Sequence, residues 1–170
     1  MTGGRTVFAA AVVVVALALE LSVLPRLSLP GATPDVVLLC VVAFGLAYGR
    51  RFGAVSGFAA GLAVDLVPPA EHPIGSWAFV LTVVGYLAGH AQKQVDRSVV
   101  VPMLVVAGAA AASPLLFAGL GNVVGDPRPT WPAAFGLLPT AILYDVVLAP
   151  FVVSGVIALA RRLEPEPVFR

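Results

Sequence analysis

The sequence predicts an all-α membrane protein, folded as a compact bundle of six transmembrane helices that forms a single integral domain over residues 1–170. Hydrophobic residues make up 59% of the chain and charged residues only 11%, whereas a soluble domain carries about 25% charged residues. Six apolar runs follow one another, separated by short junctions rich in proline, glycine or arginine. Because so apolar a chain cannot hide its surface from water, we expect the lipid bilayer to be its solvent.

The apolar runs give the expected helix boundaries. A spanning helix needs about 17–25 residues, so the second and third runs are short. They either lie in a thinned part of the bilayer or form a hairpin that does not fully cross. The junction between them is only Arg50-Arg51, and the last junction ends in Trp131, which is typical of an interfacial aromatic anchor. The expected helices are 7–24, 35–49, 52–67, 75–91, 99–121 and 134–160.

The basic residues predict the orientation, because cytoplasmic junctions of membrane proteins are enriched in Lys and Arg. With six spans and a cytoplasmic N-terminus, only Arg26 and Arg128 fall outside. The cytoplasmic side then holds Arg5, Arg50, Arg51, Lys93, Arg97, Arg161, Arg162 and Arg170. We therefore expect both termini in the cytoplasm. The pattern Ala16-x-Ala18 could be a signal-peptide cleavage site, but the apolar run continues to Leu24, so we expect it to remain as the first helix.

A stripe of small residues runs along the third segment. Gly53, Gly57 and Gly61 recur every four residues, and Asp65 continues the spacing, which puts all four on one helix face. The same spacing recurs on neighbouring segments at Gly45 and Gly49 and at Gly85 and Gly89. Small residues let helix backbones approach closely in lipid. We favour packing inside the bundle, and a docking face for a helix of another protein is the alternative.

Acidic residues inside the apolar runs are the other candidates. Asp145 lies well inside the last run, where an aspartate at mid-bilayer costs roughly 2.5–3.5 kcal/mol on insertion scales. No Lys or Arg lies inside a run to pair with it, so we expect it to be protonated or hydrogen-bonded to Thr140 or Tyr144. A polar structural contact is the favoured interpretation, with a substrate or proton site as the alternative. Asp35 opens the second run, and Glu20 and Asp65 lie nearer the outer ends of their helices.

No catalytic, cofactor-binding or metal site is predicted. Ser56 and His90 are faintly similar to a serine–histidine intramembrane protease, but the glycine two residues before the serine is missing. Tyr144-Asp145 and Asp65 are faintly similar to the paired aspartates of an intramembrane aspartyl protease, but Asp65 follows Leu62-Ala63-Val64 and so lacks the Gly-x-Gly-Asp motif. Cys40 has no second cysteine to pair with. The net charge of +1 and the lack of a basic run argue against a nucleic-acid partner.

The middle of the chain, from about residue 34 to 91, resembles the bacterial rod-shape-determining protein MreD family. The resemblance rests on an ordered set of motifs: Pro34-Asp35, Arg50-Arg51-Phe52-Gly53, Gly57-Phe58, Gly61-Leu62-x-x-Asp65, Pro73-Ile74-Gly75 and Tyr86-Leu87-x-Gly89. A weaker similarity lies at Tyr144-Asp145-x-x-x-Ala149-Pro150, where the family more often has asparagine in place of Asp145.

The resemblance implies a non-enzymatic scaffold subunit of the cell-wall elongation complex, placed in the bacterial cytoplasmic membrane and controlling cell or spore shape and peptidoglycan synthesis. The implied partners are MreC, which is a single-span protein with a periplasmic domain, the MreB filament, and the glycan polymerase and transpeptidase. The family fold is similar to the substrate-binding subunits of energy-coupling-factor vitamin transporters, so such a subunit is the alternative function. The few hydrogen-bonding side chains inside the runs favour the scaffold.

Overall fold

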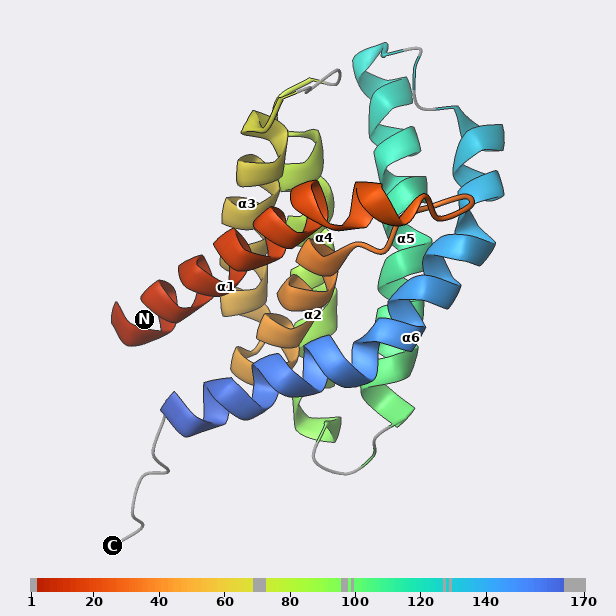
Figure 1. The fold of residues 1–170 in the computed structure, drawn as a ribbon. Helices are drawn as coiled ribbons and strands as arrows, with labels where there is room; N and C mark the ends of the chain where they lie inside the picture. The colour runs from red at the N-terminus through yellow and green to blue at the C-terminus, as the bar shows by residue number, and fades with distance from the viewer. Residues whose placement is uncertain are drawn as a thin grey trace, which may run out of the picture.

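A computed structural model describes residues 3–68, 73–95, 98, 100–126, 128 and 130–163. Within these residues every regular element is a helix, and the six α-helices confirm the all-α prediction. The elements are α1 (Gly3–Ser22), η1 (Leu24–Leu27), α2 (Val36–Tyr48), α3 (Arg50–Leu66), α4 (Ser76–Ala88), η2 (Gly89–Gln94), α5 (Val100–Val124) and α6 (Trp131–Leu163). In Figure 1, α3, α4 and α5 run side by side, while α1 and the end of α6 cross them obliquely.

Helix α2 forms the centre of the bundle. It is apolar on every side, which is typical of a helix surrounded by protein, and its side chains from Val37 to Phe44 are at most 3% exposed. Its 13 residues span only about 20 Å at 1.5 Å per residue, less than the roughly 30 Å hydrocarbon core of a bilayer. The ends of α2 must therefore be covered by protein, because lipid offers the backbone no hydrogen bonds.

Helices α1, α5 and α6 form the outside of the bundle. Each is long and apolar enough to cross a membrane, and at most 28% of the most apolar stretch in each is buried inside the protein. Their exposed side chains are large and apolar, which suits contact with lipid; they include Val7, Val14, Val15, Leu19, Leu104, Phe135, Leu143, Val147 and Phe151. Three prolines lie inside α5 and α6, where each removes a backbone hydrogen bond of its helix; they are Pro114, Pro139 and Pro150.

The turn between α2 and α3 differs from the expected one. The sequence predicts this turn at Arg50-Arg51, but Gly49 alone makes it and both arginines belong to α3. Gly49 has φ +85°, a backbone conformation that glycine adopts without strain. The side chain of Gln92 covers this turn, since its Nε2 donates to the carbonyl oxygen of Ala47 at 3.0 Å. A sharp one-residue turn thus leaves α3 free to start earlier than predicted.

The fourth helix is also shorter than expected. The prediction of one helix over 75–91 is wrong at its end, because the α-helix stops at Ala88 and continues as the 3₁₀ helix η2. Gly89 lies where the backbone of Arg50 approaches, so closely that a Cβ on residue 89 would overlap the Arg50 amide nitrogen. The contact with the start of α3 therefore coincides with the change in helix type.

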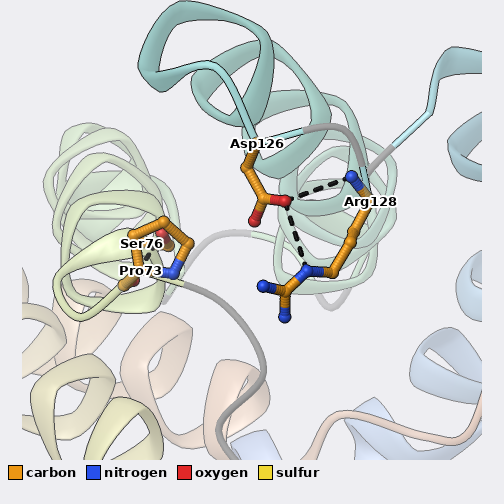
Figure 2. Close-up of polar contacts among 4 residues, drawn as sticks. All are labelled: Pro73, Ser76, Asp126 and Arg128. Carbon is orange, nitrogen blue, oxygen red and sulfur yellow. Dashed lines mark hydrogen bonds and ion pairs between the residues drawn. The ribbon is translucent and has the colours of Figure 1, made fainter.

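Two short junctions lie at the same end of the bundle, where α4 begins and α5 ends (Figure 2). The hydroxyl of Ser76 donates to the carbonyl oxygen of Pro73 at 2.8 Å. Helix α5 runs three residues past its expected end and stops at Gly125, whose φ of +75° allows Asp126 N to donate to Gly121 O at 2.9 Å. The Asp126 carboxylate then accepts from the Arg128 amide at 3.1 Å. Local polar contacts thus define both junctions.

Candidate functional site

The glycine stripe of α3 lies directly against α4. A Cβ added at Gly53 would overlap the carbonyl oxygen of Gly85, and one added at Gly57 would overlap that of Leu81. At Gly61 the overlap would be with the carbonyl oxygen of Trp77. These are backbone atoms, which cannot turn aside as a side chain can. The backbones of the two helices therefore touch at three positions, each about one helical turn from the next.

Helix α2 joins this contact at one point. A Cβ on Gly45 would lie 2.7 Å from the carbonyl oxygen of Gly85, and one on Gly53 would lie 2.9 Å from the Cα of Gly45. Three helices thus meet at Gly45, Gly53 and Gly85. The geometry is that of packing inside the bundle, because α4 fills the groove along α3. A helix from another protein would have to displace α4 to reach these glycines.

Asp65 closes the same groove at its far end. Its carboxylate accepts three backbone hydrogen bonds, from Gly75 N at 2.8 Å, Trp77 N at 3.0 Å and Ala78 N at 3.1 Å. These donors belong to the start of α4, where a helix has amide groups without a partner inside the helix. Asp65 is only 1% exposed. It therefore caps α4 and fixes its position along α3.

A second group of carboxyls gathers at the start of α2. Asp35 caps this helix through Leu38 N at 2.7 Å. Glu20, from α1, accepts from Val37 N at 3.2 Å, and Asp145, from α6, accepts from Asp35 N at 2.9 Å. The positive end of a helix dipole favours acceptors of this kind. We call Glu20, Asp35 and Asp145 the carboxyl cluster; it joins α1, α2 and α6.

Helix α6 also holds the chain that leads into α2. Thr140 Oγ1 accepts from Ala32 N at 2.9 Å, and the hydroxyl of Tyr144 donates to Pro30 O at 3.2 Å. A side chain at Gly31 would overlap Thr140, so the segment lies flat against the helix. The irregular backbone before α2 thus finds hydrogen bonds within the protein, which backbone outside a helix needs where lipid replaces water.

These contacts correct one expectation. Thr140 and Tyr144 do not bond to Asp145; they bond to the backbone of the segment before α2, and Asp145 accepts from Asp35 N. The role of Glu20 was not predicted either. A single acidic residue near the end of an otherwise apolar helix was the only signal for it, and its partner Val37 belongs to the next helix.

The residue pairs of the rejected protease interpretations are not brought together by hydrogen bonds. Ser56 Oγ donates to Gly53 O at 3.2 Å, and His90 Nδ1 lies 3.1 Å from Tyr86 O. Asp65 caps α4, whereas Asp145 belongs to the carboxyl cluster at the start of α2. Each of these side chains thus contacts a nearby backbone group and not the other member of its proposed pair.

Asp145 offers a test of the cluster as a structural contact. Asp145→Ala is expected to lower the free energy of unfolding by about 1–3 kcal/mol, because Asp35 N loses its acceptor. Asp145→Asn keeps an oxygen in place and should unfold close to the wild type. Thermal unfolding of the purified protein in detergent measures both. Equal destabilisation by the two substitutions would show that charge, and not the hydrogen bond, holds this contact.

The structure and the comparisons together define the class and the family. The class is a polytopic α-helical membrane protein whose central helix is anchored at its start by acidic side chains. The profile of the family described as rod shape-determining protein MreD matches residues 3–153. The chain belongs to the MreD family, which confirms the resemblance and extends it well beyond residues 34–91. No curated protein and no solved structure matches the chain.

Proposed function

We propose that this chain is a non-enzymatic scaffold subunit of the machinery that elongates the bacterial cell wall. The observation that carries the proposal is the family match over residues 3–153, since the family determines rod shape. The fold is consistent with a scaffold: its short helices pack closely in the centre, and its long helices present apolar faces outward. The partners in this proposal are an MreC-like single-span protein, MreB, and the glycan polymerase and transpeptidase.

Co-purification tests the partner. The protein is tagged at its N-terminus, extracted from its own bacterium in mild detergent, and the captured proteins are identified by mass spectrometry. A scaffold of this kind should bring along a single-span protein with a periplasmic domain. Capture of ATP-binding subunits in its place would support a transport subunit and contradict the proposal. The family match gives that alternative no support.

The proposed location is the cytoplasmic membrane, with six crossings and both termini inside. Three described helices are long enough to cross alone, so the proposal adds crossings by the shorter α2, α3 and α4. In Figure 1 the start of α1 and the end of α6 both lie at the left of the bundle. The seven residues after Leu163 lie outside the described part of the chain.

Reporter fusions test the orientation. A reporter that is active only in the cytoplasm, joined at Gly4 or after Arg170, should be active at both positions. A fusion within the junction near Gly125 should be inactive and serves as the control, because this junction is expected outside. A periplasmic signal from the fusion after Arg170 would mean that the number of crossings is odd and would direct attention to the short helices α2 and α3.

A further inference from the structure

A cavity of about 230 Å³ lies beside the start of α2. It has room for about seven water molecules and is smaller than the roughly 300–1,000 Å³ that drug-sized ligands occupy. All three members of the carboxyl cluster line it, together with side chains from α3, α4, α5 and α6. The cavity therefore suits a ligand of few atoms that meets several acidic groups at once.

The carboxyl cluster has hydrogen-bonding capacity left over toward this cavity. Glu20, Asp35 and Asp145 each use one oxygen for a backbone amide at the start of α2. In the part of the chain that the structure describes, the other oxygen of each carboxyl has no hydrogen bond, and no Lys, Arg or His pairs with the cluster. Asp145 is 2% exposed, and Glu20 and Asp35 are half-buried. The unbonded acceptors thus border a small, partly open cavity in which no described residue offers them a donor.

Ser113 provides an independent sign of a ligand. It lies on α5, is 6% exposed and lines the same cavity. Its hydroxyl makes no hydrogen bond with any described residue, although a serine inside a helix can bond to the carbonyl one turn back. Buried hydroxyls in proteins are nearly always hydrogen-bonded. A polar ligand in the cavity would supply a hydrogen-bond partner for the Ser113 hydroxyl.

We propose that this cavity binds the primary ammonium group of a small amine, with unbonded oxygens of the carboxyl cluster accepting from the ammonium and Ser113 bonding to a neighbouring polar atom. An ammonium group brings up to three donors and a positive charge, whereas the cluster has unbonded acceptors and, among the described residues, no paired cation. Trp77, stacked on Phe117 with ring centroids 5.0 Å apart, adds an aromatic wall that suits a cation.

A bare metal ion fits this arrangement less well. Among the described residues, no three acidic, histidine or cysteine side chains are placed closely enough to hold one. An amine can come from two sources, a free molecule such as ethanolamine or the headgroup of phosphatidylethanolamine, and the chemistry of recognition is the same.

The test uses the full chain in nanodiscs of phosphatidylglycerol, titrated with ethanolamine. The melting temperature should rise in a saturable way, by about 5 °C at a hundredfold excess over Kd. Ethylene glycol, which replaces the ammonium by a hydroxyl, should have no effect. Asp145→Asn and Ser113→Ala should each weaken binding about tenfold or more. Ser154→Ala, at an exposed serine of α6, should bind as the wild type does and is the matched control.

A second set of nanodiscs, containing phosphatidylethanolamine, separates the two sources. If these discs raise the melting temperature where free ethanolamine does not, Asp145→Asn and Ser113→Ala should abolish the increase. That result would assign the cavity to the lipid headgroup and support the proposal. Ser113→Ala should leave the melting temperature without ligand unchanged, because its hydroxyl has no protein partner, so loss of binding there cannot be loss of fold. The proposal is overturned by no effect of either amine, by an equal effect of ethylene glycol, or by unchanged binding in both variants.

Discussion

Replacing Gly57 by alanine is expected to lower the free energy of unfolding by about 3 kcal/mol, and replacing it by leucine is expected to prevent the bundle from forming. The added Cβ would overlap the carbonyl oxygen of Leu81, which is part of the α4 backbone. Only separation of α3 and α4 relieves this overlap, and that would disturb the neighbouring contacts of Gly53 and Gly61. A fall of roughly 6–12 °C in melting temperature is the expected readout for the alanine variant.

Gly108 gives the matched control, since it is a helical glycine in α5 with open space around its Cβ position. Gly108→Ala adds the same methyl group and should be neutral or slightly stabilising, because alanine favours a helix by up to about 1 kcal/mol over glycine. If the Gly57→Ala variant had the same melting temperature as the Gly108→Ala variant, the backbone contact between α3 and α4 would be refuted.

Asp65→Ala should have the next largest effect, a loss of about 3 kcal/mol or more in the free energy of unfolding. Three backbone amides at the start of α4 would lose a charged acceptor inside the bundle, and each unsatisfied amide costs about 1–3 kcal/mol. Asp65→Asn should fall between the wild type and the alanine variant, since its amide nitrogen cannot accept. Thermal unfolding in detergent measures the melting temperatures of the wild type and the two variants, and these should fall in that order.

Complementation of a deletion strain extends this test to function. Asp65→Ala should restore cell shape less well than Glu71→Ala, because the sequence places Glu71 in the loop before α4 and outside any helix. Glu71 lies outside the residues that the structure describes. Wild-type behaviour of both variants would remove Asp65 from the residues that matter for function.

The helices could be predicted from the sequence because apolar runs and their Pro, Gly and Arg junctions are local signals. Ends that depend on contacts between helices could not. The change from α4 to η2 at Gly89 lies where the backbone of Arg50 approaches, a residue about 40 positions earlier. The turn at Gly49 was missed for a related reason: two arginines suggested a junction, whereas one glycine with positive φ suffices.

The candidate sites were predictable only in part. A four-residue spacing identifies the face of α3 that carries Gly53 and Gly61, but does not say which helix lies against it. The hydrogen bond from Asp35 to Asp145 joins residues 110 positions apart, and the contact from Glu20 requires α1 to cross the start of α2. Which carboxyls meet is decided by how the helices pack, and a single sequence carries no direct record of that.

Cell shape after deletion of the gene is the decisive measurement for the proposed function. In the bacterium that encodes this chain, deletion should turn elongated cells or spores round and fragile, and supplying the wild-type gene should restore them. No added vitamin should repair the defect, because a scaffold supplies no nutrient. Normal shape together with a growth defect that one vitamin rescues would contradict the scaffold and establish a transport subunit in its place.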